Sequence, residues 1–142
     1  VYTVGTFDML HVGHLRLLEH CQKLGSVVAV GVASDRVVHS YKPNKPVIPL
    51  EQRMQMLRAL RCVDIVIPYY DLEYVSGCRT VAADIFVVGE DWGTKAHNLA
   101  VEAYLLDQGS EIVKVQYDLR TSSTQIKQTV MAQPARKLAV AV

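Results

Sequence analysis

Short apolar runs alternate along the chain with stretches whose apolar residues recur every three or four positions. Five runs rich in β-branched residues are predicted as strands: residues 1–6, 26–33, 63–68, 84–89 and 111–117. Because these runs are largely apolar, they fit a sheet that is buried on both faces. We therefore expect an α/β fold, a Rossmann-like, doubly wound, five-stranded parallel sheet with helices on both faces.

Helices are predicted between these strands. An apolar stripe of Leu17, Leu18, Cys21 and Leu24 stops at Gly25, and further helices are expected over residues 50–61 and 98–108. Residues 71–83 have a weaker helical pattern, interrupted by a Ser-Gly pair. Residues 1–131 are predicted to form one domain. Residues 132–142 lack a clear period and are predicted to be a tail or a linker.

The composition excludes several classes of protein. The chain has 142 residues and a net charge of +1, so it is long enough for a core and unsuited to coating nucleic acid. No apolar run approaches the roughly 20 residues of a membrane span. Cys21, Cys62 and Cys78 are odd in number and form no Cys-x-x-Cys. We therefore expect reduced thiols and a cytoplasmic location.

The segment after the first strand, Gly-Thr-Phe-Asp-Met-Leu-His-Val-Gly-His at residues 5–14, carries the strongest chemical signal. We call it the histidine corner. His11 and His14 are three residues apart at a predicted helix start, where free backbone N–H groups and the helix dipole favour phosphate. Gly13 would let a polyanion approach the backbone. A zinc pair is the alternative, but no cysteine or acidic ligand has matching spacing; two surface histidines are another.

Three further patches follow predicted structural elements. Lys42 and Lys45 lie in a proline-bounded loop and suit phosphate binding, although an isolated loop of this kind is usually a solvated basic surface. Gly89 permits a tight turn, after which Asp91 could bind a ribose hydroxyl or a magnesium-bound water. Trp92 could pack against a ribose or base or fill the core, and both interpretations stay open.

The last patch, Arg-Thr-Ser-Ser-Thr-Gln-Ile-Lys at residues 120–127, places consecutive hydroxyls at a helix start. One hydroxyl would suffice for an N-cap, so the run favours a second anion site with Arg120 as a bidentate donor. A plain N-cap is the alternative.

Together these patches resemble the nucleotidyltransferase superfamily with the His-x-Gly-His signature. Within it, the chain is most similar to the cytidylyltransferase branch and to the glycerol-3-phosphate cytidylyltransferase family. The similarity covers about residues 1–130, in order and at similar spacing. Besides the histidine corner it includes the motifs Glu51-Gln52-Arg53, Arg61-Cys62-Val63-Asp64, Gly89-Glu90-Asp91-Trp92 and Ser122-Ser123-Thr124-Gln125-Ile126-Lys127.

The resemblance implies roles for individual residues. The catalytic residues would be His11, His14, Lys42 and Arg120. The nucleotide would be bound by Thr6, Phe7, Asp8, Gly13, Lys45, Gly89, Asp91, Trp92, Thr121, Ser122, Ser123 and Thr124. The acceptor would meet Asp8, Lys42 and Arg79. The family works with Mg²⁺, which would accompany CTP, and no protein metal-ligand set is predicted. A homodimer is implied, with Arg61 and Asp64 at its interface.

The expected reaction is transfer of CMP from CTP to a small phosphate or phosphonate acceptor, with release of pyrophosphate. Two departures from the family pattern affect the site. Arg120-Thr121 directly abuts Ser122, so this loop is shorter than usual. Residues 71–77 lack the family's acceptor lysine, and Arg79 is the nearest cation. Hydroxyethylphosphonate is therefore considered beside glycerol 3-phosphate. An adenylyltransferase using ATP and a non-catalytic nucleotide-binding domain are the alternatives; no nucleic-acid or membrane partner is expected.

Overall fold

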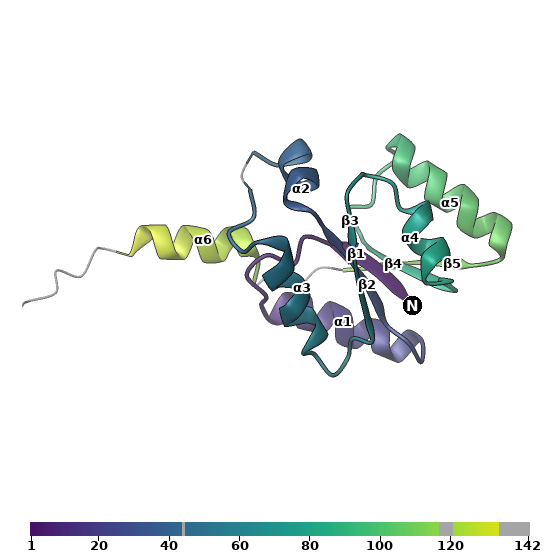
Figure 1. The fold of residues 1–142 in the computed structure, drawn as a ribbon, viewed down its shortest axis with the longest axis horizontal. Helices are drawn as coiled ribbons and strands as arrows, with labels where there is room; N and C mark the ends of the chain where they lie inside the picture. Colours follow the sequence, from purple (N-terminus) through teal and green to yellow (C-terminus); the bar gives the residue numbers. More distant parts are fainter. Residues whose placement is uncertain (44, 117–120, 134–142) are drawn as a thin grey trace, which may run out of the picture.

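A five-stranded parallel sheet forms the centre of the computed structural model, which describes residues 1–43, 45–116 and 121–133 (Figure 1). Its strand order is β3-β2-β1-β4-β5, and every neighbouring pair is parallel. The strands are β1 (Tyr2–Gly5), β2 (Ala29–Ala33), β3 (Ile65–Tyr69), β4 (Ile85–Gly89) and β5 (Glu111–Val115). The expected Rossmann-like α/β fold is confirmed, and no strand extends more than one residue beyond its predicted run.

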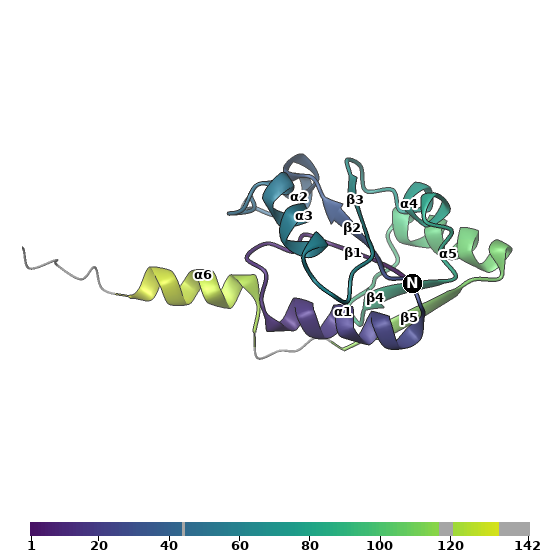
Figure 2. The same cartoon turned by 60° about the horizontal axis from the view of Figure 1, so that its bottom comes forward.

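Helices cover both faces of the sheet, as predicted. They are α1 (Val12–Leu24), α2 (Asp35–Tyr41), α3 (Leu50–Arg58), α4 (Val75–Thr80), α5 (Ala96–Gln108) and α6 (Ser123–Ala132). Apolar residues of α1 and α3 pack on one face, and those of α4 and α5 pack on the other. Helix α6 extends away from these layers in both views (Figures 1 and 2).

Three helices differ from the prediction by more than two residues. Helix α2 was not predicted; the Ser34 hydroxyl starts it by accepting the Val37 N–H at 3.2 Å. Helix α4 is shorter than residues 71–83 because the Glu73 carboxylate accepts the Val75 and Ser76 N–H groups and fixes its start. Helix α3 ends at Arg58, three residues early. No helix in the described part of the chain is long and apolar enough to cross a membrane.

The order of connections reverses between β1 and β4, which are neighbours at the centre of the sheet. In open α/β sheets, ligands bind outside the carboxyl ends of the strands at such a switch point. The histidine corner follows β1, and the Gly-Glu-Asp-Trp segment follows β4. The fold therefore places two of the four predicted patches at the position where a ligand is expected.

Tyr2 sets a packing constraint that reaches three elements. Its side chain is buried and stacks on Phe86, with ring centroids 5.6 Å apart. A Cβ atom on Gly31 of β2 or on Gly77 of α4 would overlap the Tyr2 hydroxyl oxygen. Packing thus requires Gly77, the glycine of the Ser-Gly pair that weakens the helical pattern of α4.

We predict that Gly77→Ala lowers the free energy of unfolding by about 1–3 kcal/mol, because the buried Tyr2 hydroxyl must move. This loss would outweigh the gain of about 1 kcal/mol in helix propensity. Urea denaturation measures it. Gly93→Ala is the control, since open space surrounds that position. In the double variant Tyr2→Phe/Gly77→Ala much of the loss should disappear; a stabilised Gly77→Ala protein would contradict the explanation.

Candidate active site

The two imidazoles of the histidine corner stack on each other, with ring centroids 3.8 Å apart and planes at 24°. His11 is the N-cap of α1 and accepts the Gly13 N–H on its Nδ1 at 3.1 Å. The Nδ1 of His14 in turn accepts the His11 N–H at 3.4 Å. This reciprocal arrangement is a capping box built from two histidines. The rings therefore share one side of the helix, as their spacing predicts.

These hydrogen bonds fix the protonation of both rings. A neutral imidazole whose Nδ1 accepts a backbone N–H carries its proton on Nε2. Desolvation by burial, and then the nearby His11 and Lys42, lower the pKa of His14 to about 4, although Asp8 opposes the shift. Burial also lowers the pKa of His11. Both side chains are therefore neutral Nε2–H donors at neutral pH, suited to hydrogen-bonding phosphate oxygens.

The backbone around the histidines is tightly packed. Phe7 and Met9 have left-handed φ angles of 52° and 49°, which are unfavourable for residues other than glycine and are typically held by surrounding structure at functional sites. A Cβ atom on Gly13 would lie 2.9 Å from the His11 ring and 3.2 Å from the Thr121 carbonyl oxygen. Gly13 is thus required where the first turn of α1 meets the segment before α6.

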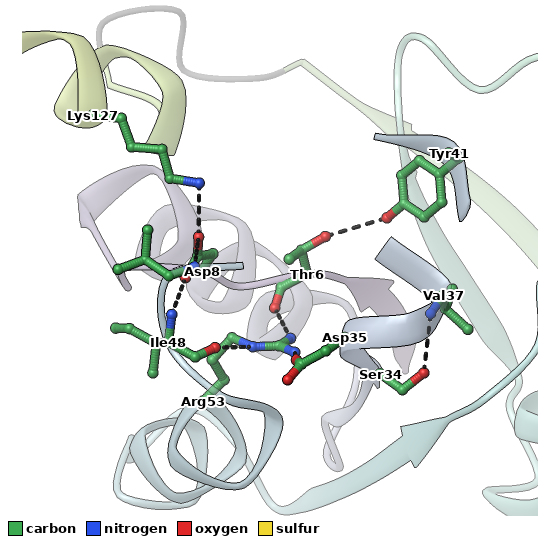
Figure 3. Close-up of polar contacts among 10 residues, drawn as sticks. Thr6, Asp8, Ser34, Asp35, Val37, Tyr41, Ile48, Arg53 and Lys127 are labelled. Atoms are coloured by element: carbon green, nitrogen blue, oxygen red, sulfur yellow. Dashed lines mark hydrogen bonds and ion pairs between the residues drawn. The ribbon is translucent and has the colours of Figure 1, made fainter. Parts of the chain in front are cut away.

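Asp8 joins the histidine corner to two other segments (Figure 3). The N–H groups of Val47 and Ile48 donate to its two carboxylate oxygens, each at 2.9 Å. Lys127 of α6 lies 3.0 Å from Oδ2, and the Ser123 hydroxyl donates to the Asp8 carbonyl at 2.6 Å. Burial raises the pKa of Asp8, but these amides and Lys127 outweigh burial and lower it overall. We call these five residues the Asp8 junction.

Arg53 of α3 supports the same region, although its sequence context predicted no separate role for it. Its guanidinium is buried and donates to the carbonyls of Ile48 and Thr6 and to the carboxylate of Asp35 (Figure 3). The Thr6 hydroxyl lies 3.3 Å from that of Tyr41 at the end of α2. The signal that could have identified Arg53 is its place in the Glu-Gln-Arg motif, within the amphipathic helix α3.

The proline-bounded loop with Lys42 and Lys45 follows α2 and approaches the histidine corner. Lys42 is the C-cap of that helix, and both Lys42 and Lys45 are exposed. Partial desolvation and then Lys127 lower the pKa of Lys42, while Asp8 and Asp91 oppose the shift. Lys42 is therefore within electrostatic reach of three of the predicted patches.

Beyond β4, Trp92 packs against the core. Its ring centroid lies 5.7 Å from those of Phe86 and Tyr74, and its indole N–H donates to Glu102 at 2.7 Å. These contacts favour the core interpretation that the sequence left open. Gly89 ends the strand, and Asp91 is exposed beside it.

The hydroxyls at the start of α6 have different partners. Ser122 is the N-cap and accepts the Gln125 N–H at 3.1 Å, and Ser123 belongs to the Asp8 junction. Thr124 is exposed, and Thr121 is half-buried. Two of the hydroxyls therefore have structural partners, which explains part of the run without a ligand. The first amides of the helix still point outward without intrahelical acceptors.

Other predicted residues lie apart from this cluster or outside the described ranges. Arg79 stands over the Tyr104 ring of α5, with its guanidinium carbon 5.4 Å from the ring centroid. Its contact is thus with α5, on the face of the sheet opposite α1. Asp64 accepts the Val28 N–H, and Arg61 lines a surface hollow with Leu15 and Glu19. Arg120 lies outside the described residues, as does the part of the predicted tail beyond Gln133.

Comparisons with known proteins identify the family of this chain. A family model described as cytidylyltransferase-like matches residues 2–129. The chain belongs to the cytidylyltransferase-like family. Its curated relatives include the bifunctional protein HldE of Pectobacterium carotovorum, 34% identical over 137 residues, and that of Yersinia pestis, 36% identical over 131 residues. These matches cover 96% and 92% of this chain but only 28% and 27% of the relatives.

Solved structures share the fold of this cytidylyltransferase-like chain. The lipopolysaccharide core biosynthesis protein from Thermoplasma volcanium has a TM-score of 0.68 and 24% identity, covering 82% of this chain and 93% of that one. A protein of unknown function from Archaeoglobus fulgidus has a TM-score of 0.59 and 22% identity, covering 85% and 92%. At these identities the similarity establishes the fold alone.

We predict that His14 titrates with a midpoint of about 4 and keeps its proton on Nε2 above that pH, because burial disfavours the imidazolium. Since its pKa is 6.5 in the unfolded chain, this residue should reduce stability progressively as the pH falls from 6.5 to about 4. Imidazole nitrogen and Cε1 NMR shifts between pH 3.5 and 8 measure the midpoint, with His14→Gln for assignment. A midpoint near 6.5 would contradict the half-buried, neutral ring.

Proposed function

We propose that the chain transfers CMP from CTP to a small phosphate or phosphonate acceptor and releases pyrophosphate. The observation that carries the proposal is the pair of stacked, neutral histidines at the start of α1, next to Lys42 and the Asp8 junction. A site suited to phosphoryl transfer combines uncharged hydrogen-bond donors, the free amides of a helix start and the ammonium groups of lysines.

The proposed step is a direct displacement. An acceptor oxygen attacks the α-phosphorus and forms a new P–O bond, while the bond to the bridging oxygen breaks and pyrophosphate leaves with the electron pair. Because the acceptor is already an anion, no covalent enzyme intermediate is required. The Nε2–H groups of His11 and His14 would donate to α-phosphate oxygens, and Lys42 would balance the charge shared between acceptor and nucleotide.

Magnesium would enter with the nucleotide. Both carboxylate oxygens of Asp8 are already engaged by protein donors, and the described residues contain no group of three His, Cys, Asp or Glu that could hold a metal ion. Mg²⁺ commonly uses substrate phosphates plus one or two carboxylates. Asp91, which is exposed beyond β4, would hold such an ion through one of its waters. When bound, the ion would neutralise phosphate charge.

ATP is the second candidate donor, because a structural observation weakens the preference for cytosine. The resemblance to cytidylyltransferases around Gly89–Trp92 favours cytosine, but the Trp92 ring packs against Phe86 and Tyr74 and its indole N–H donates to Glu102. The histidine corner contacts phosphates and carries no information about the base. An adenylyltransferase with the same corner would therefore look alike in these residues.

A second copy of the chain is also part of the proposal. Arg61, from the segment that the family resemblance assigns to a dimer interface, is exposed and lines a hollow with Glu19 and Cys62. Sedimentation of the chain as a monomer at micromolar concentration would contradict the dimer without affecting the proposed reaction.

We expect pyrophosphate release with CTP, Mg²⁺ and one acceptor from a panel of glycerol 3-phosphate, phosphoethanolamine, phosphocholine and hydroxyethylphosphonate. ATP is run in parallel, and EDTA should abolish release in the productive pair. Release with ATP alone would show that the chain transfers AMP and not CMP. Tight nucleotide binding without release for any acceptor would favour a non-catalytic binding domain.

We predict that His14→Ala lowers kcat by about 10²- to 10³-fold with a smaller change in KM for the nucleotide, because a preorganised donor to the transition state is lost. Steady-state pyrophosphate release measures both constants. His20→Ala is the matched control, since His20 is an exposed histidine of the same helix. Near-normal turnover of His14→Ala would exclude the mechanism drawn here.

A further inference from the structure

Helix α6 has little apolar packing to hold it in place. None of its described residues is buried, and Val130 and Met131 near its end are 63% and 85% exposed. Both views show the helix extending away from the sheet and its covering helices (Figures 1 and 2). A ten-residue helix is marginal by itself in water, so its placement depends on the contacts of its first turns.

Those contacts converge on Asp8. Ser123 donates to the Asp8 carbonyl and Lys127 pairs with its carboxylate, from positions four residues apart on one face of α6. Asp8 itself is held firmly, because it is 3% exposed and the Val47 and Ile48 amides donate to its carboxylate. The Asp8 junction thus sets the position of α6 relative to the histidine corner.

The ion pair differs from an ordinary surface pair. The Asp8 side chain is 4% exposed and that of Lys127 is 30% exposed, so solvent screens their attraction poorly. Removing one partner of a pair that is largely shielded from water leaves an uncompensated charge, which costs more than the loss of a surface contact. Lys127 is therefore a strong tie between the body of the molecule and α6.

We propose that Lys127 is a positioning residue: through its ion pair with Asp8 it holds the hydroxyl-bearing start of α6 opposite the histidine corner, where that turn binds the triphosphate end of the nucleotide. This inference rests on the proposed nucleotidyl transfer. Lys127 acts on α6, so its loss affects the triphosphate and leaves the nucleoside monophosphate, held at the histidine corner, almost unchanged.

The test compares Lys127→Met and Lys127→Arg with Lys23→Met, which removes an exposed lysine from the last turn of α1. Calorimetry gives the dissociation constants for CTP and CMP, with ATP and AMP in parallel. Lys127→Met should weaken triphosphate binding about tenfold or more and monophosphate binding less than about twofold. Lys127→Arg should recover most of the loss, and Lys23→Met should resemble the wild type.

Hydrogen exchange of α6 amides without nucleotide supplies a readout that does not depend on the reaction. In Lys127→Met, exchange at Ile126–Val130 should become about tenfold faster, because release of α6 returns the Asp8 carboxylate to water, while amides of the central strand β1 exchange almost as in the wild type. Unchanged exchange, or equal losses of CTP and CMP affinity, would overturn the proposal. If the wild type binds no nucleotide, the proposed function fails and the exchange result still decides whether Lys127 holds α6.

A direct contact between Lys127 and a phosphate is distinguished by a double-mutant cycle with Asp8→Asn. If Lys127 acts through Asp8, Lys127→Met should add less than about a twofold loss of CTP affinity in the Asp8→Asn background. A loss as large as in the wild-type background would show a direct contact and overturn the positioning role. Should Asp8→Asn fail to fold, the exchange measurement on the single variants still decides between the two roles.

Discussion

The burial of the Asp8 carboxylate is the constraint on which the site depends. A carboxylate on a residue that is 3% exposed must be fully paired, because an unpaired charge at that depth would be strongly destabilising. Its partners come from the segment before α3 and from α6, so these segments must meet the histidine corner when the chain folds. The buried Arg53 guanidinium must also be paired. It donates to the carbonyls of Thr6 and Ile48 and so joins the same two segments.

This pairing also limits what each charged group can do chemically. The carboxylate oxygens of Asp8 accept from protein donors, so Asp8 organises the site and has little capacity left as a base or metal ligand. The histidines are neutral because partial burial lowers the pKa of both rings, and their Nδ1 atoms are occupied by backbone amides. The remaining chemistry is hydrogen-bond donation from Nε2 and the charge of lysines, which suits catalysis by positioning and electrostatic stabilisation.

The features that the sequence predicts well are local. The strands follow from apolar runs, and the stacked His11–His14 pair follows from a three-residue spacing at a helix start. The Asp8 junction was not predictable in this way, because its hydrogen bonds join pairs of residues that are separated in the sequence by 39, 40 and 115 positions. The role of Trp92 likewise depends on Glu102 and on aromatic neighbours from other elements, which no periodicity indicates.

Substrate choice would have a different physical basis from the fold and the proposed phosphate site. The histidine corner is tied to the core through Phe7, Asp8 and Gly13, so changes there disturb packing as well as chemistry. Lys45 and Asp91, by contrast, are exposed at the edge of the sheet, where substitution leaves the core intact. Proteins of one fold and family can therefore keep a motif of this kind and still differ in the molecules on which they act. Specificity should accordingly be sought in the exposed loops after α2 and β4, outside the histidine corner.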